Sequence, residues 1–278
     1  MAVDERDRSD IEAVLAHRHD QGADLWTTPD RRLLKGAPFS ALESPLLLLE
    51  LGMSRDDPVL RQSTDLVFSA WQPDGRFTLY PRGAVLPCQT AIAARFLCRM
   101  GHADDSRVRT TLRHLLETQH HDGGWRCNKF SFGRGPETEN SNPMPTLVTL
   151  DAFRHTDSTA GPAVDHAVES LLNHWTSRAP IGPCHYGIGT LFMQVSYPFR
   201  DYNLFYWVYV LSFFDRARRD PRFGEALAAL EAKLEDGQVV VERVVPKLAR
   251  LAFCRKGRAS ELATARYREI RANLGLRR

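Results

Sequence analysis

Two short segments of this chain repeat each other, and this repeat limits the possible folds more than any other feature. Residues 71–77 read WQPDGRF and residues 119–125 read QHHDGGW, so that Asp74 and Gly75 recur 48 positions later. A repeat period of this length is typical of proteins built from stacked pairs of helices.

Each copy of the repeat lies between an amphipathic segment and a more apolar one. The preceding segments, 56–71 and 104–119, carry apolar residues at helical spacing and begin with an aspartate pair suited to cap a helix. The following segments, 86–101 and 142–155, are more apolar. Pro87 and Pro145 suit a first helical turn, and Gly101 suits a helix end.

The same alternation extends over the rest of the chain. We expect apolar helices within 40–53, 202–214 and 245–257, amphipathic helices within 161–175, 220–234 and 259–275, and an additional helix near 9–20. Few segments alternate with a period of two residues, so the predicted class is all-α. An apolar helix needs cover on most sides and an amphipathic helix on one. We therefore predict a ring of about five helical pairs, apolar inside and amphipathic outside, which need not close; an open solenoid is the alternative. The whole chain, 1–278, is expected to be one domain, with 1–23 as an N-terminal extension and 24–278 as the repeats.

Composition indicates a soluble globular protein, with 43% hydrophobic and 26% charged residues. The formal net charge is +3 and the sequence shows no Lys/Arg tract, so we expect no nucleic-acid partner. The N-terminus has no apolar stretch of the kind that a secretory signal needs, so we expect a cytoplasmic protein. The five cysteines are scattered without a CxxC motif, which indicates free thiols.

The repeat resembles a known family motif. Gln119, Gly123 and Trp125 fit the pattern Q-x-x-x-G-x-W, and residues 71–77 look like a degenerate copy. This is the repeat motif of the squalene cyclase and protein prenyltransferase superfamily, and the resemblance covers residues 56–155. It implies an α/α toroid whose inner-helix N-termini and preceding loops surround a central cavity. The D-x-D-D motif of class II terpene cyclases is absent from the sequence, and no zinc motif of the prenyltransferases can be located.

Zinc is one candidate ligand, because histidine and cysteine are its usual partners. His120, His121 and Cys127 lie close in sequence, and Cys184 with His185 forms a second pair. Adjacent histidines in a turn do not both face one ion. The favoured interpretation is that the histidines are solvated and the cysteine side chains are packed in the interior. We therefore expect no metal cofactor.

The loop after the second repeat is basic. Arg126, Lys129 and Arg134 are suited to bind the anionic head of an isoprenoid ligand if this loop lies at the rim of the cavity. The alternative is a solvated loop whose arginines pair with Glu137 and Glu139. These two carboxylates precede an inner helix, where each either caps the helix or acts as a Brønsted acid in an apolar cavity.

A glycine-rich, aromatic segment follows at 182–206. Cys184, His185 and Tyr186 are expected to provide polar groups of the cavity, since glycines leave neighbouring side chains exposed. Tyr197 and Tyr202 belong to a dense aromatic set that forms either a cavity wall or plain core. Gln89, at the start of another inner helix, is expected to face the same end of the cavity.

Three functions are compatible with these residues. The leading hypothesis is a terpenoid cyclase-like or prenyltransferase-like protein that binds an isoprenoid or other apolar ligand, with cyclisation or prenyl transfer as the reaction if it is an enzyme. Contact with a membrane surface and the oligomeric state stay open. The alternatives are a carbohydrate-active enzyme, favoured by a polar open groove, and a non-catalytic scaffold, favoured by a filled centre.

Overall fold

The computed structural model describes residues 5–83, 85–127, 131–157 and 160–276, and it is mainly helical. The α-helices of this part of the chain are α1 Glu5–Ala16, α2 Ser44–Glu50, α3 Pro58–Phe68, α4 Pro87–Arg99, α5 Ser106–Glu117, α6 Pro143–Phe153, α7 Pro162–Ser177, α8 Leu204–Leu211, α9 Asp215–Arg218, α10 Pro221–Glu231 and α11 Glu261–Asn273. Short 3-10 helices are η1 Pro136–Glu139, η2 Pro246–Leu248 and η3 Ala252–Cys254, and β1 Leu234–Glu235 pairs antiparallel with β2 Gln238–Val239. The prediction of a mainly α-helical protein is confirmed.

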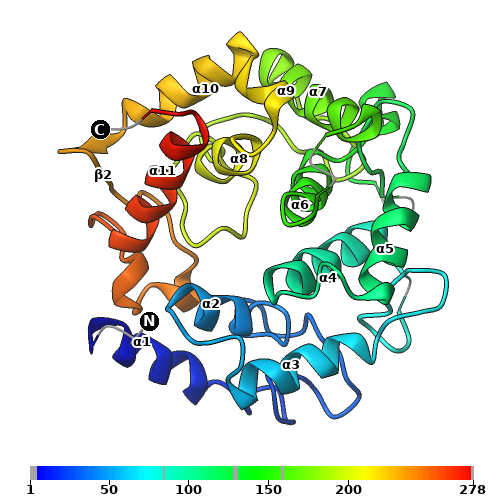
Figure 1. Ribbon diagram of the computed structural model, residues 1–278, viewed down its shortest axis with the longest axis vertical. Coiled ribbons are helices and arrows are strands. Elements are labelled where there is room, and N and C mark those ends of the chain that lie inside the picture. The colour runs from blue at the N-terminus through cyan, green and yellow to red at the C-terminus, as the bar shows by residue number, and fades with distance from the viewer. Residues whose placement is uncertain (1–4, 84, 128–130, 158–159, 277–278) are drawn as a thin grey trace.

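The helices form two layers (Figure 1). Helices α2, α4, α6 and α8 lie nearer the centre, while α1, α3, α5, α7, α10 and α11 lie at the periphery. Every residue of α8 is buried, whereas α5 buries one stripe that includes Val108, Leu112 and Leu115. The apolar helices are thus covered on most sides and the amphipathic ones on a single face, as their hydrophobic patterns predict.

Helix starts follow from local sequence. The Asp57 and Asp105 side chains accept hydrogen bonds from the second residue of α3 and α5, at 2.8 Å in each case. Pro87 occupies the first position of α4, where the missing N–H costs no hydrogen bond. These caps confirm the helix boundaries expected from the aspartate pairs.

The repeat motif forms the joint between an outer and an inner helix. Gly123 adopts φ 91°, and a Cβ at this position would lie 2.4 Å from the His166 carbonyl oxygen, so glycine is needed. The Gln119 Nε2 donates to the carbonyls of Gly123 and Ala163 at 2.6 and 2.8 Å. The buried Trp125 donates from its indole to the Leu115 carbonyl at 2.8 Å, so the motif is structural.

The expected apolar helix within 245–257 is wrong, since this segment forms the two 3-10 turns η2 and η3. The reason is a long-range contact: the buried Asp10 carboxylate accepts the N–H groups of Ala252 and Phe253 at 2.9 and 2.8 Å. These amides therefore do not enter an α-helical ladder. The same contact joins α1 to η3, across 242 residues of sequence. Helix α1 itself begins earlier and ends earlier than the expected 9–20.

The centre of the two layers is filled by side chains. Tyr197 is 1% exposed, and Phe199 stacks at 5.1 and 4.8 Å from the rings of Tyr206 and Tyr209. A cavity of about 30 Å³, with room for about two waters, remains beside them. The larger cavities of the described residues lie around this point and not within it.

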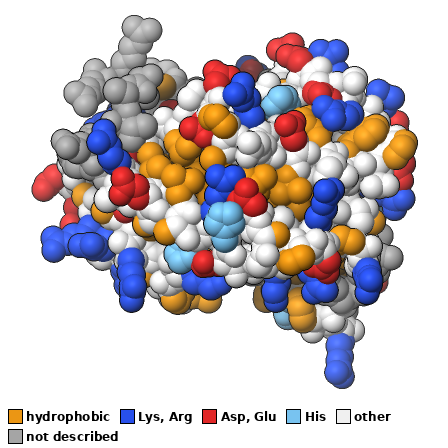
Figure 2. Space-filling model, turned by 90° about the horizontal axis from the view of Figure 1, so that it is seen from below, with side chains coloured by type: hydrophobic (Ala, Val, Ile, Leu, Met, Phe, Trp, Pro, Cys, Tyr) orange, Lys and Arg blue, Asp and Glu red, His pale blue; other side chains and the backbone are white. Residues whose placement is uncertain are grey.

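The surface seen from below in Figure 2 mixes acidic, basic and hydrophobic side chains without a large patch of one sign. Among the helices of the described residues, none has the length and apolarity that crossing a bilayer requires.

Candidate functional site

A cavity of about 500 Å³ opens at the N-terminal ends of α4 and α6. Its walls come from these two helices, from the segment 184–202 between α7 and α8, and from Arg243 after β2. The volume falls within the range of small-molecule sites, and the lining is mainly apolar with a few polar groups.

Helix N-termini surround this cavity. Cys88 of α4 and Met144 of α6 both occupy the second helical position and line the wall, and Tyr202 lines it just before α8. Pro87 of α4 and the prolines 143 and 145 of α6 have no N–H group to offer, but the first turn of a helix still carries the positive end of the helix dipole. A ligand with a negatively charged or hydrogen-bond-accepting group is therefore favoured here.

Asn142 connects the start of α6 to the opposite wall. Its Oδ1 accepts the Cys184 N–H at 2.9 Å. Gly182 permits this approach: it has φ 73°, and a Cβ there would lie 2.6 Å from the same Oδ1. The Asn142 Nδ2 is buried and has no hydrogen-bond partner among the described residues. Asn142 thus fixes the turn that carries Cys184, and its Nδ2 stays without an acceptor among the described residues.

Aromatic rings form one side of the cavity. The Tyr202 ring centroid lies 5.8 Å from that of Tyr186 and 4.8 Å from that of Phe192. The Tyr202 hydroxyl and the His174 Nδ1 share a hydrogen bond of 2.8 Å, which fixes the ring orientation. Burial raises the pKa of Tyr186 to about 12, so its phenol is neutral at physiological pH. This wall offers flat apolar surface to a ligand.

Two arginines lie at the polar side. The Arg200 guanidinium pairs with Glu43 at 3.1 Å, and the Arg243 Nη2 pairs with Asp201 at 3.2 Å. The Nε of Arg243 is buried without a partner among the described residues. A buried donor left unsatisfied costs about 1–3 kcal/mol, and an acceptor on a ligand would remove that cost.

No family model matches this chain, and the search of curated proteins finds no relative. Evidence for function comes from the side chains of the cavity.

Four of the residues predicted from sequence line this cavity: Cys184, His185, Tyr186 and Tyr202. His185 has φ 56° at the tip of the turn, and its side chain is 44% exposed. Its Nε2 lies 3.6 Å from the Glu137 Oε1, so the carboxylate sits behind the imidazole and not at the cavity wall.

The remaining predicted residues lie elsewhere. Glu139 has a side chain 74% exposed and pairs with Arg126 at 3.4 Å. Arg126 also donates to the Thr138 carbonyl and lines a separate cavity of about 530 Å³ beside the repeat joint. Arg134 is exposed, and Lys129 lies outside the described residues.

Two further predicted residues belong to the interior. Gln89 is 7% exposed, with its Oε1 unpaired among the described residues, and it does not line the cavity. Tyr197 contributes to the filled centre described above, where its hydroxyl donates to Glu50.

Two cysteines of the cavity, Cys88 and Cys184, are protonated thiols at physiological pH. Burial raises the pKa of Cys88 to about 12 and that of Cys184 to about 11, and Cys127 lies nearby in the same wall. Thiols with raised pKa values are poor nucleophiles. Within the described ranges no group of three His, Cys, Asp or Glu side chains is placed to hold a metal ion, and His120 instead lies 3.1 Å from Asp122.

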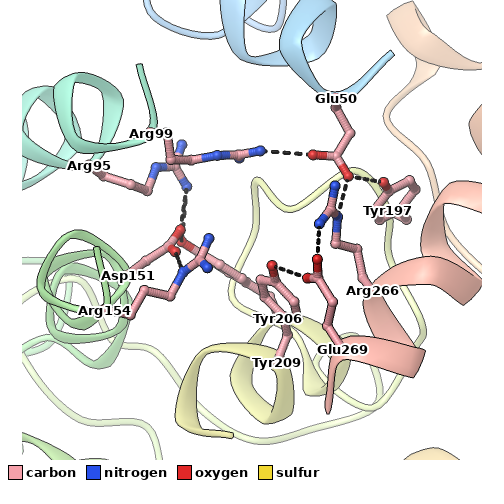
Figure 3. Close-up of polar contacts among 10 residues, drawn as sticks. All are labelled: Glu50, Arg95, Arg99, Asp151, Arg154, Tyr197, Tyr206, Tyr209, Arg266 and Glu269. Atoms are coloured by element: carbon pink, nitrogen blue, oxygen red, sulfur yellow. Dashed lines mark hydrogen bonds and ion pairs between the residues drawn. The ribbon is translucent and has the colours of Figure 1, made fainter. Parts of the chain in front are cut away.

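Sequence reasoning missed a buried ionic network between the inner helices (Figure 3). The Arg95 Nη1 donates to the Tyr206 hydroxyl at 2.9 Å, and this hydroxyl donates to the Asp151 Oδ2 at 2.7 Å. Burial acts to raise the pKa of Asp151, but Arg154 and Arg95 outweigh burial and hold it well below its ordinary value. The available signal was the charged residues inside otherwise apolar helices.

Proposed function

We propose that this chain is an α/α toroid that binds an apolar ligand with an anionic head group, of the isoprenoid type, in the cavity between α4, α6 and the segment 184–202. The cavity lies beside the filled centre, near the N-terminal ends of inner helices. The chain thereby departs from a toroid with one large central chamber.

One observation carries this proposal: a mainly apolar cavity of about 500 Å³ is lined by Asn142 and Arg243, whose Nδ2 and Nε are buried donors without a partner among the described residues. Apolar walls suit a prenyl chain, and unpaired donors beside helix N-termini suit its phosphate or carboxylate. The anion would be held by these two side chains, in place of the basic loop expected from sequence.

The apolar walls favour an isoprenoid over a sugar, which would need more polar partners than this cavity provides. A scaffold without a ligand is disfavoured because a cavity of this size remains open beside the filled centre. Should the ligand be converted, His185 is the polar side chain of the wall best placed to exchange a proton, with Glu137 behind it at 3.6 Å.

Arg243→Gln tests the proposal. With farnesyl diphosphate as the probe, we expect binding by the wild-type protein and binding at least about tenfold weaker by the variant, because one charge-assisted contact contributes about 1.5–3 kcal/mol. Binding of farnesol, which has no charge, should change little. Isothermal titration calorimetry measures both affinities.

The matched control is Arg250→Gln, since Arg250 is exposed and lies outside the cavity. Loss of farnesol and farnesyl diphosphate binding by the same factor would contradict a role of Arg243 in holding the head group. Absence of binding by the wild-type protein would overturn the proposal itself.

A further inference from the structure

A second cavity, of about 520 Å³, lies at the opposite ends of the same inner helices. Its wall includes Glu50 at the end of α2, Arg99 at the end of α4 and Arg154 just after α6. Along α4, Arg99 is eleven residues from Cys88 of the first cavity, a separation of about 17 Å. The two cavities are therefore distinct sites.

The acceptors of this second cavity are already engaged. Glu50 accepts from Tyr197 and from Arg266 at 2.7 Å with one oxygen, and from Arg99 at 2.8 Å with the other. Glu269 accepts from Arg266 and Tyr209, at 2.7 Å each. Neither carboxylate has an oxygen left without a donor.

The carbonyl groups at the ends of α2 and α4 do not need the arginines as hydrogen-bond donors. At the end of α4 the carbonyls of residues 96, 97 and 98 accept from the backbone N–H groups of residues 100, 102 and 101. The carbonyls of residues 47, 48 and 49 in α2 accept from the N–H groups of residues 51, 53 and 52 in the same way. Gly52 and Gly101, at φ 91° and 92°, make these turns possible. The arginines are thus not needed as caps.

Donors remain in surplus. Arg154 uses its Nε for Asp151, while its guanidinium carbon lies 4.6 Å from the ring centroid of Phe213. The exposed Arg55 side chain lines the same cavity, and no ion pair engages it among the described residues. The buried His155 Nε2 also has no partner in that part of the chain. Burial lowers the pKa of His155 to about 3, so the ring is neutral at physiological pH.

The formal charges around this cavity, like its free donors, favour an anionic ligand. The cavity and the network behind it hold the guanidinium groups of Arg55, Arg95, Arg99, Arg154 and Arg266 and the carboxylates of Glu50, Asp151 and Glu269. Five positive groups against three negative ones leave a surplus of two positive charges. Figure 3 shows Arg99, Arg154 and Arg266 projecting from three separate segments into this region.

We propose that this second cavity binds a small dianion of the phosphate class, held by Arg55, Arg99 and Arg154 with His155 at its edge. Planar guanidinium groups match the tetrahedral oxygens of phosphate in pairs, and several arginines from different helices surround an anion better than one. A dianion also cancels the local surplus of charge, which a neutral ligand does not.

Titration of the full-length protein with inorganic phosphate, at constant ionic strength kept with chloride, tests this inference. We expect saturable binding and a melting temperature that rises with phosphate concentration, because a ligand that binds the folded state stabilises it. Glycerol phosphate in place of phosphate separates a phosphomonoester from the free ion. Succinate tests carboxylate dianions, and tighter binding of succinate would contradict the phosphate class.

Arg55→Gln is the informative variant, since an exposed side chain can be changed without unfolding the protein. Phosphate affinity should fall about tenfold, as expected for one charge-assisted contact. Arg61→Gln, at an exposed position of α3 outside the cavity, is the matched control and should leave the affinity unchanged.

A spectroscopic readout places the anion. Phosphate should shift the imidazole resonances of His155 and raise its pKa, while those of His19, whose side chain is 73% exposed, stay constant. Equal losses in Arg55→Gln and Arg61→Gln, or unchanged His155 resonances at saturation, would overturn the inference. So would loss of phosphate binding in Arg243→Gln, because the anion would then occupy the first cavity.

Discussion

At the scale of single residues, the hydroxyl of Tyr206 joins two buried charges. Arg95 and Asp151 lie 3.9 Å apart, and the hydroxyl between them accepts from one and donates to the other. The side chains are 6% and 2% exposed, so water cannot replace the hydroxyl. A buried ion pair completed by a neutral group depends on that group for its remaining hydrogen bonds.

Tyr206→Phe should therefore lower the free energy of unfolding by about 1–3 kcal/mol, because the buried Arg95 Nη1 and Asp151 Oδ2 each lose their hydrogen bond. Urea unfolding followed by circular dichroism measures this difference. Tyr80→Phe, at a half-buried position outside the network, should stay within about 0.5 kcal/mol of the wild type. Equal effects of the two substitutions would show that the hydroxyl does not bridge the pair.

At the scale of helices, sequence patterns predicted those helices whose stabilising contacts lie close to them in the sequence. Spacing of apolar residues and the caps at Asp57 and Asp105 predicted α3 and α5. The helix predicted within 245–257 does not form for the opposite reason: two of its N–H groups donate to Asp10, which is distant in sequence. For the first cavity, Cys184 to Tyr186 were recognisable from glycines and aromatics in one segment. Arg243 lies 59 residues beyond Cys184, and no pattern in the neighbouring sequence predicts that it lines the same cavity.

The cap of α5 gives a prediction at this scale. Asp105→Ala should destabilise the protein by about 1 kcal/mol, whereas Asp104→Ala, whose side chain is 93% exposed, should change little. The hydrogen bond from Arg107 lowers the pKa of Asp105 to about 2 from its ordinary 3.8. A lowered pKa means that the stabilisation is complete above pH 3.8 and is lost as pH falls toward 2. Denaturation curves at pH 6 and pH 2.5 should therefore show that the free energies of unfolding of the wild type and Asp105→Ala differ at pH 6 and approach each other at pH 2.5.

At the scale of the whole molecule, the Asp10 carboxylate joins the first helix to the last inner segment. It is 4% exposed and accepts the first two backbone N–H groups of η3. Helix α1 and the segment that precedes α11 thus lie side by side in Figure 1. Such a contact between distant segments couples their unfolding.

Asp10→Ala should lower the free energy of unfolding by about 2–4 kcal/mol, because the buried Phe253 N–H and the part-buried Ala252 N–H both lose a charged acceptor. Hydrogen–deuterium exchange should show faster exchange in both α1 and residues 246–254, although these segments lie more than 200 residues apart. Glu12→Ala, at an exposed position of the same helix, is the control and should leave both segments protected. Faster exchange in α1 alone would mean that the 3-10 turns hold without the carboxylate. The contact would then attach a helix to the surface and would not close the arrangement of helices.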